Sequence, residues 1–505
     1  MTTGNAQPAI IQEGCVLSFP LTGRLGFFIR PSVHFLQKFI RSSRPAGRTV
    51  FMTPIFDFIH QTSYADLPET VQNQAVRCVL DLCGSLIGGR QTRLSKIIRD
   101  HVCLAFGGDQ ATILLDGRRC SAPGAALANG MTIDSLDIHD SHRESLGHAG
   151  AHIFPTLLAV NELNCSEGRA LVSGPEFLAA VVVGYEIACR AGMALHATVS
   201  DYHTSGAWGA VSSAALYSRL RRLDTNRTRH AVGIAEYHGP RSQMMRVIDT
   251  PTMLKDGSGW GAMAGVSAGM LAESGFTGAP AITLESADVA DWWADLGARW
   301  ITLEQGFKTH AVCWWAQPAI EAVLGIARRM GPDVDAIHAI RVETFEKATR
   351  LSHPRPESTE EAQYSLPYPV AAALRCWADR GDDGWYGVGP GQLLEANLSD
   401  PRVLELAEKI ELVSDPDLTA RFPEKFLARA VIEMNDGTEL ASPEMTFRGE
   451  MDDPLTDEEL LAKFRWLAGG ILPPDRVDAI EKAVFALPTA KSIEPLLDEL
   501  VEGVD

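Results

Sequence analysis

The sequence predicts a mainly α protein, with a large all-helical domain built from the N- and C-terminal parts of the chain and a smaller α+β domain between them. Three observations support this prediction. Apolar residues recur at helical spacing through most of the first three hundred residues. Alternating apolar residues, which are typical of strands, follow in 337–347 and 428–445. After residue 450 the helical pattern returns, and this last stretch is expected to complete the first domain.

In the first part of the chain, helices are predicted within 53–98, 155–194 and 204–237. The stretch that begins at Leu67 has apolar residues at helical spacing, and Gly88 and Gly89 are expected to end it. The segment "SGAWGAVSSAALYSRL" is dense in small residues, which predicts buried helices in close contact. A further helix of this kind is expected in "AGVSAGMLAESGFTGAP", with a glycine at its end.

In the α+β part, Asn435-Asp436-Gly437 is expected to form a hairpin turn between two short strands. Helical pieces are predicted around 361–377 and 401–412. Beyond them, Thr456 is a predicted helix N-cap, because Glu459 follows three residues later. These changes in pattern divide the chain into 52–304, the first part of the helical domain, 305–449, the α+β domain, and 450–505, the completion of the helical domain.

Residues 1–51 differ from the rest, with six basic residues and one acidic residue. This composition is typical of a mitochondrial transit peptide. The alternative, which we favour, is a disordered or non-native extension ahead of a natural start at Met52. The expected location is therefore cytoplasmic, or the mitochondrial matrix if the segment is a transit peptide.

Composition excludes several classes of protein. The 505 residues are 46% hydrophobic, and their formal net charge is -19. A nucleic-acid partner is not expected, because phosphate binding needs a basic surface. No uninterrupted apolar run approaches 18 residues, so no membrane-spanning helix is expected. The nine Cys are scattered without a C-x-x-C pair, which predicts reduced thiols and no iron–sulfur cluster.

The segment "DSLDIHDSHRESLGHAG" (134–150) concentrates titratable residues in a loop that precedes a buried helix. We single out Asp137, Asp140, His142 and His148 there, because titratable loop residues on a buried scaffold are typical of active sites. A metal site is one alternative, although the spacing fits no standard ligand set. The other alternative is that these residues cap helices or lie exposed at the surface.

Four further segments carry candidate residues. His203 precedes a small-residue helix, whose N-terminus favours an anion. Lys255 precedes a glycine-rich turn, and the absence of a preceding strand argues against a dinucleotide site. Lys308 and His310 precede an amphipathic helix. The last segment, "EAQYSLPYPVAAAL", contributes Gln363 and Tyr368.

Taken in order, these segments resemble the MmgE/PrpD family over about residues 53–490. The family's acid-rich "D-x-D-D-T/S-H" and following "HPG/HPS" are matched by Asp137, Asp140-Ser141-His142 and His148-Ala149-Gly150. Its later elements are matched by His203, by Lys255 with "GFTGAP", by Lys308-Thr309-His310-Ala311-Val312-Cys313, and by "AQYSLPY".

The chain departs from the family pattern in three places. His139 stands where Asp or Asn is frequent. "KDGSGWG" replaces a "K-R-x-H-x-G" pattern, so one substrate-facing His is missing. Gln317 stands where decarboxylases of the family often carry His. These departures leave the substrate open.

The resemblance implies a helical domain with an α+β lid, a homodimer, and an enzyme without cofactor or metal. It also implies a small di- or tricarboxylate substrate. Dehydration like that of 2-methylcitrate dehydratase and decarboxylation like that of cis-aconitate decarboxylase are both expected lyase reactions. The expected catalytic residues are His148, His203, Lys255 and Asp137. The expected substrate-binding residues are Asp140, Ser141, His142, Lys308, His310, Gln363 and Tyr368.

The chemistry of such a reaction suits these residue types. Loss of a proton or of CO2 beside a carboxylate leaves negative charge, which fixed Lys cations stabilise. His residues transfer protons near neutral pH. The carboxylates are expected to orient these groups and to tune their pKa values. Two alternatives to a lyase stay open. One is an epimerase that acts on a dicarboxylate, similar to iminodisuccinate epimerase, and the other is a non-catalytic ligand-binding relative.

Overall fold

Helices dominate the computed structural model, which describes residues 53–381 and 385–503. The predicted segment 1–51 lies outside the described residues. The helices ahead of the sheet are α1 (Thr53–Gln61), α2 (Glu69–Gly89), α3 (Arg93–Ala105), α4 (Ala122–Asp134), α5 (Gly150–Ser166), α6 (Gly174–Thr198), α7 (Gly206–Arg221), α8 (Thr225–His238), α9 (Met245–Asp249), α10 (Ser258–Glu273) and α11 (Ile282–Glu285). The mainly α fold class predicted from the sequence is confirmed.

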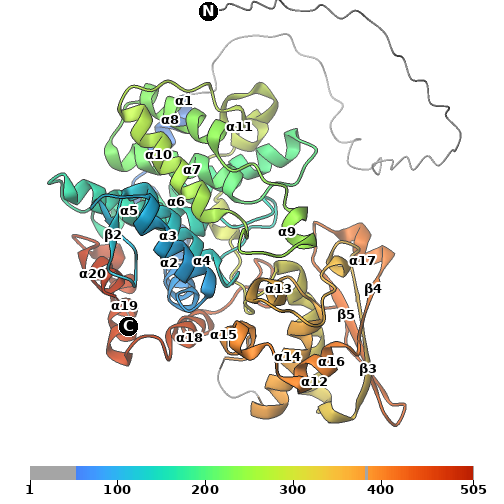
Figure 1. Cartoon of the computed structure of the whole chain (residues 1–505). Coiled ribbons are helices and arrows are strands. Elements are labelled where there is room, and N and C mark those ends of the chain that lie inside the picture. Colours follow the sequence, from blue (N-terminus) through green and yellow to red (C-terminus); the bar gives the residue numbers. More distant parts are fainter. Residues whose placement is uncertain (1–52, 382–384, 504–505) are drawn as a thin grey trace, which may run out of the picture. The chain divides into compact units, whose positions relative to one another are not determined.

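Small residues allow the central helices α7 and α10 to pack closely, as predicted from their sequences (Figure 1). Every residue of α7 from Gly206 to Arg221 is buried. A Cβ atom at Gly265 of α10 would lie 2.4 Å from the Ser213 Cβ and 2.5 Å from the Ala210 carbonyl oxygen. A larger residue at 265 would therefore force the two helices apart.

Helix α6 is long and apolar enough to cross a membrane by length and composition, and it is the one such helix among the described residues. The prediction from the sequence, which considered only uninterrupted apolar runs, did not identify this helix. The apolar stretch is wholly buried inside the protein, which is the environment of a core helix.

The second group of elements is built on a four-stranded sheet of order β4-β3-β5-β6. The strands are β3 (Ile337–Thr344), β4 (Ile410–Ser414), β5 (Ala428–Met434) and β6 (Glu439–Ala441). β3 pairs in parallel with β4 and antiparallel with β5, so that Ile340 lies between Ile410 and Ile432. The hairpin turn at Asn435-Asp436-Gly437 is confirmed, with Gly437 at φ 85°.

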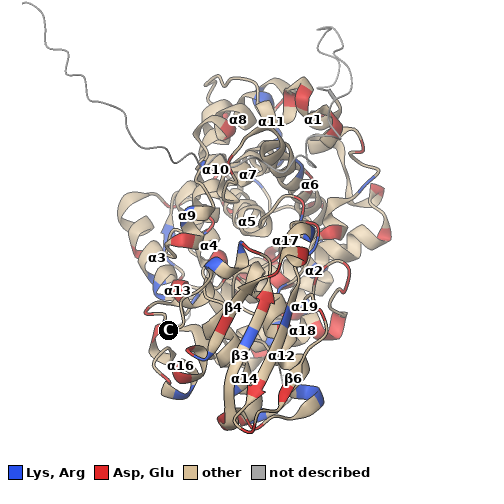
Figure 2. Ribbon diagram, turned by 90° about the vertical axis from the view of Figure 1, so that its right-hand side faces the viewer, with Lys and Arg blue, Asp and Glu red and all other residues tan. Residues whose placement is uncertain are grey.

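Helices cover one face of this sheet (Figure 1). The helices that contact its strands are α12 (Gln317–Met330) and α14 (Pro367–Arg380). The other helices of this part of the chain are α13 (Thr359–Gln363), α15 (Pro390–Leu393), α16 (Pro401–Ala407) and α17 (Pro416–Arg421). Of these, α12 packs on β5, and α16 packs on α14. Arg341, Glu343 and Arg429 alternate with the buried residues of β3 and β5 and form ion pairs with one another. Figure 2 shows charged residues along these strands.

Two predictions of secondary structure need correction. The helix expected over 401–412 ends at Ala407, and β4 follows at Ile410, because the mixed segment "IELVS" pairs with the buried strand β3. The first three hundred residues also contain one short antiparallel pair, β1 (Ala111–Thr112) with β2 (Arg119–Cys120). Two-residue strands are too short for alternation to show in a sequence.

The C-terminal helices α18 (Asp457–Ala468), α19 (Pro474–Ala486) and α20 (Glu494–Val501) pack with the first group. The predicted capping box of α18 is present, with Thr456 and Glu459 in its two positions. One hydrophobic core joins apolar residues of 55–307 with those of 455–500, and a second core is built mainly from 311–447. The loop 135–149 contributes to the second core, although the helices on either side of it belong to the first.

Candidate functional site

The loop 135–149, which joins α4 to α5, holds the residues that the sequence singles out most strongly. Its residues Leu136 and Ile138 belong to the second hydrophobic core. Between them Asp137 has a φ of 53°, in the left-handed region. A non-glycine residue held in this conformation costs on the order of 1–3 kcal/mol and persists only when the surroundings impose it. This strained residue is the centre of the cluster described below.

Lys308 holds Asp137 by both its side chain and its backbone. The Lys308 Nζ donates hydrogen bonds to Asp137 Oδ1 at 2.5 Å and to the Asp137 carbonyl oxygen at 2.8 Å. Both side chains are buried. Burial alone would raise the pKa of Asp137, but the ammonium groups of Lys308 and Lys255 hold it well below its usual range. Asp137 is therefore a fixed negative charge.

His148 has one free ring nitrogen that faces two carboxyl groups. Its Nδ1 lies 2.7 Å from the Asp140 carbonyl oxygen and is best placed to donate to it. The opposite nitrogen, Nε2, lies 3.7 Å from Asp137 Oδ1 and 3.9 Å from Asp256 Oδ2. Burial and the nearby charge of Lys308 lower the His148 pKa well below its usual value. His148 is thus neutral at physiological pH, with an unprotonated Nε2.

Lys255 lies in a second strained segment, with a φ of 50°. Its ammonium group donates a hydrogen bond to Gln363 Oε1 and lies 4.8 Å from the centre of the Tyr364 ring. Gln363 is fixed in turn, because its Nε2 donates to the Ser135 carbonyl oxygen at 2.9 Å. This chain of contacts links α13 to the loop that carries Asp137.

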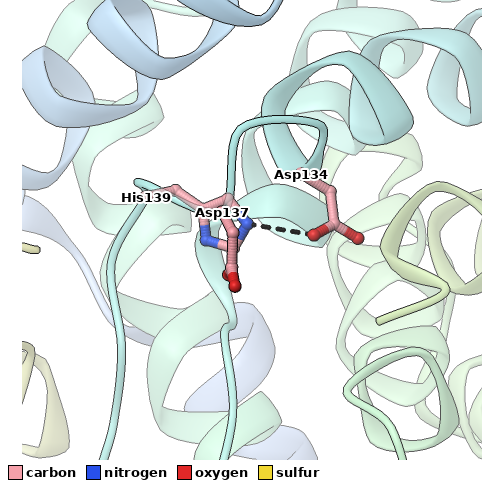
Figure 3. Close-up of side chains that lie close together, drawn as sticks. All are labelled: Asp134, Asp137 and His139. Atoms are coloured by element: carbon pink, nitrogen blue, oxygen red, sulfur yellow. Dashed lines mark hydrogen bonds and ion pairs between the residues drawn. The ribbon is translucent and has the colours of Figure 1, made fainter. Parts of the chain in front are cut away.

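Asp134 and His139 form a buried pair beside Asp137. Figure 3 shows the His139 ring directed at the Asp134 carboxylate, with 3.3 Å between Nε2 and Oδ1. Burial would raise the Asp134 pKa, but the hydrogen bond from His139 lowers it to about 2. For His139 burial would lower the pKa, whereas Asp134 raises it above the usual value. The pair is therefore an ion pair at neutral pH.

Ligand atoms of Asp134, Asp137 and His139 lie within 4.8 Å of one another, a spacing that suits a metal ion. The charges, however, are already balanced within the protein. Lys308 neutralises Asp137, and protonated His139 neutralises Asp134. We therefore interpret the three residues as parts of ion pairs.

A cavity of about 570 Å³ adjoins this cluster. Lys255 and Gly257 contribute to its wall, together with Thr204 at the start of the α7 segment and Gln243 and Arg246 near α9. Lys255 thus belongs to both the buried cluster and the cavity wall, although its side chain is only 1% exposed.

Three predicted substrate-binding residues have their polar side-chain atoms engaged within the protein. Both ring nitrogens of His142 are engaged, by Ser145 and by Glu304. Those of His310 are engaged by Glu321 and by the Val388 backbone. The Tyr368 hydroxyl donates to the Gln392 carbonyl oxygen at 2.9 Å. Contact of these three side chains with a substrate stays a prediction.

Three more predicted residues lie beside the cluster. Asp140 supports His148 through its carbonyl oxygen, and its carboxylate accepts a hydrogen bond from the Gly150 amide at 3.0 Å, which makes it a positioning residue. The Ser141 hydroxyl is buried without a hydrogen-bond partner. The backbone of His203 forms an isolated antiparallel β-bridge with that of Gln243, which lies in the cavity wall. Within the described residues, no hydrogen bond or ion pair joins its ring to Asp137 or Lys308.

The sequence missed two members of the cluster. Asp256, next to Lys255, accepts a hydrogen bond from the Ser205 hydroxyl, and its second oxygen, Oδ1, is buried without a partner. Tyr364 contacts Lys255, whereas the sequence singles out Tyr368 in this segment, as a substrate-binding residue. A signal for Asp256 was present, since "KDGSGWG" departs from the family pattern at that residue. Nothing in one sequence distinguishes the two tyrosines.

Comparison with known proteins assigns both parts of the chain to one family. Residues 53–296 match the MmgE/PrpD N-terminal domain, and residues 310–487 match the MmgE/PrpD C-terminal domain. A cis-aconitate decarboxylase-like protein of Aspergillus oryzae is 26% identical over 92% of this chain and 99% of its own length. The cis-aconitate decarboxylase of Aspergillus terreus is 23% identical over 86% of this chain and 92% of its own. The human cis-aconitate decarboxylase is 26% identical over 87% and 91%.

Proposed function

Since this chain belongs to the MmgE/PrpD family, we propose that it is a cofactor-independent lyase that acts on a small di- or tricarboxylate. Relatives named as decarboxylases favour loss of CO2 as its reaction. Dehydration of a similar hydroxy acid is the alternative within the same class. Both reactions leave negative charge on a carbon beside a carboxylate.

The observation that carries this proposal is the buried Asp137 carboxylate, which lies between the charges of two Lys and the unprotonated nitrogen of His148. Lys255 and Lys308 both act on the charge of Asp137, and Asp137 lies 3.7 Å from His148 Nε2. Within a low-dielectric interior, fixed cations stabilise a developing anion without the cost of reorganising water. The imidazole nitrogen is positioned to transfer the proton.

The roles follow from these contacts. Lys255 lines the cavity and binds a substrate carboxylate, displacing the amide oxygen of Gln363. Lys308, held by Asp137, stabilises the charge left when CO2 departs. His148 transfers the proton through Nε2, while its Nδ1–H stays on the Asp140 carbonyl oxygen. The Nδ1 hydrogen bond fixes the tautomer, and burial keeps Nε2 free of a proton.

Access to the cluster requires movement, because the side chains of Asp137, His148 and Lys308 are almost wholly buried. We propose that substrate enters through the cavity at Lys255 and that the segment 240–257 moves to admit it. Closure would then exclude water from the reacting carbon.

The test is proton NMR in deuterium oxide with citrate, 2-methylcitrate, cis-aconitate and an iminodisuccinate-like dicarboxylate. Loss of a carboxylate with one deuterium incorporated into the carbon skeleton of the product supports a decarboxylase. New vinyl signals without CO2 release support a dehydratase. Deuterium in an unchanged carbon skeleton would instead show an epimerase, and no turnover of any of the four acids would contradict the proposal. Lys308→Met is the inactive control, and Tyr368→Phe is the matched active one.

A further inference from the structure

The carboxyl group of Asp256 belongs to the buried cluster, but the proposed reaction gives it no role. It lies in the turn between Lys255, at φ 50°, and Gly257, at φ 65°. Its carbonyl oxygen accepts a hydrogen bond from the Gly206 amide at 3.0 Å, and its Oδ2 accepts one from the Ser205 hydroxyl. Its backbone and side chain are thus both anchored to the start of α7.

Asp256 is connected to His148 by two routes. Its Oδ2 lies 3.9 Å from His148 Nε2. The Ser205 hydroxyl, which donates to Oδ2, accepts a hydrogen bond from the His148 amide at 3.0 Å. Ser205 therefore fixes the carboxyl group and the imidazole relative to each other.

The charges around Asp256 disfavour its ionised form. Unlike Asp137, it has no ion pair with a Lys among the described residues, and its Oδ1 has no partner. Burial and the negative charge of Asp134 raise its pKa to about 7. The charged and titratable groups that act on Asp256 or lie beside it are Asp134, Asp137, His148, Tyr202, Lys255, Lys308 and Tyr364.

His148 alone does not supply a proton at neutral pH. Its Nδ1–H is committed to the Asp140 carbonyl oxygen, and burial keeps its Nε2 unprotonated. A lyase that replaces a carboxylate by hydrogen needs one proton for each CO2 that it releases. That proton must be held near Nε2 until the carbon is ready to receive it.

We propose that Asp256 stores this proton and passes it to the substrate carbon through His148 Nε2. The inference rests on the proposed lyase function and makes Asp256 a positioning and proton-storing residue that acts through His148. The 3.9 Å separation shortens to a hydrogen bond by a small side-chain movement.

The step balances in atoms and charge. The bond between the substrate carbon and its carboxylate breaks, and CO2 leaves. In cis-aconitate the electron pair is delocalised through the adjacent double bond to the carbon beside a remaining carboxylate, which Lys308 or Lys255 binds. The proton moves from Asp256 Oδ2 to Nε2 and from Nε2 to that carbon, where a C–H bond forms as the double bond shifts. Solvent then returns a proton to the Asp256 carboxylate.

The experiment measures cis-aconitate decarboxylation from about pH 5 to pH 9 for the wild type, Asp256→Asn and Ser205→Ala. The wild-type rate should fall above about pH 7, as Asp256 loses its proton. Asp256→Asn keeps the shape but stores no proton, so it should be slower by about 10²–10⁴-fold and should lose this decline. Ser205→Ala removes a hydrogen bond that favours the carboxylate, so it should move the decline to higher pH.

The outcomes separate this inference from the proposed function. Asp256→Asn with a rate within about twofold of wild type and the same decline overturns the inference alone. If Asp256→Asn does not fold, an unmoved decline in Ser205→Ala overturns it. If the wild type turns over none of the acids, the proposed function fails and the proton-delivery role fails with it. Infrared spectroscopy then still decides whether Asp256 holds a proton. The band of a protonated carboxylic acid should disappear near pH 7 in the wild type and should be missing in Asp256→Asn.

Discussion

The ammonium nitrogen of Lys308 lies 2.5 Å from Asp137 Oδ1 and 2.8 Å from the Asp137 carbonyl oxygen, so one buried cation holds both the charge and the left-handed backbone of this residue. Such a contact differs from a surface ion pair. Both groups are buried, and each is costly to bury without the other. The pair links the segment that precedes α12 to the loop between α4 and α5.

We expect Lys308→Met to destabilise the protein by about 3–5 kcal/mol, because it leaves the Asp137 carboxylate buried without its main cation. Urea unfolding monitored by circular dichroism measures this loss. Activity should fall below detection.

The control for this variant is a double-mutant cycle with Asp137→Asn. The double variant removes both charges and should recover most of the lost stability without recovering activity. A Lys308→Met single variant as stable as wild type would contradict the buried ion pair.

Stability should depend on pH through Asp256 with a defined sign. Its folded-state pKa of about 7 lies above the value of about 4 expected in the unfolded chain. Such a group contributes stability below pH 4 that is lost as pH rises to 7. The Asp256→Asn variant does not lose stability in this way. The difference between its free energy of unfolding and that of the wild type should therefore rise between pH 4 and 7 and then level off. Urea midpoints measured at intervals across this range test the prediction. A difference that does not vary with pH would contradict it.

The opposite sign is expected for Asp134, whose pKa of about 2 lies below the unfolded value. It contributes stability above pH 4 that is lost as pH falls to 2, by about 2 kcal/mol. Asp134→Asn should therefore destabilise the protein at pH 7 by more than at pH 3. Equal losses at the two pH values would show that the ion pair with His139 is unimportant.

The sequence predicts those parts of the fold that depend on local pattern. The α18 capping box at Thr456 and the hairpin turn at Gly437 each require particular residue types at fixed spacing, and both are present. β4 was missed because "IELVS" has too few residues to show a period and becomes a strand only by pairing with β3.

The cluster was predictable in part for a related reason. Asp137, His148, Lys255 and Lys308 lie in segments whose composition is unusual for a buried scaffold. Asp256 and Tyr364 depend on three-dimensional contacts, namely the approach of Ser205 to one and of Lys255 to the other. The same limit applies to His310, whose polar neighbours in the sequence do not reveal the hydrogen bond to Glu321.

The buried pair of Lys463 and Asp81 joins the C-terminal helix α18 to α2 and to the site loop. Lys463 Nζ lies 2.5 Å from Asp81 Oδ1 and 2.8 Å from the carbonyl oxygen of Ile138, which follows Asp137. We expect Lys463→Met to destabilise the protein by about 3–5 kcal/mol. It should also lower activity at concentrations of urea that leave the protein folded, because the loop loses its anchor.

Arg465 on the same helix provides the matched control. Its ion pair with Glu481 is half exposed and should contribute less than about 1 kcal/mol. Arg465→Met should therefore keep both stability and activity. Equal effects of Arg465→Met and Lys463→Met would show that α18 tolerates neither change for reasons unrelated to the site.

The two tyrosines of "AQYSLPY" should differ in their effect on catalysis. Tyr364→Leu removes the aromatic face that lies 4.8 Å from the Lys255 ammonium, a contact that contributes about 2 kcal/mol when desolvated, so kcat/KM should fall about thirtyfold. Tyr364→Phe keeps this face and should recover most of the rate. Tyr368→Phe removes only the hydrogen bond to Gln392 and should cost about 1 kcal/mol of stability with kcat unchanged. A Phe variant at 364 as slow as the Leu variant would show that the hydroxyl, and not the ring, carries the effect.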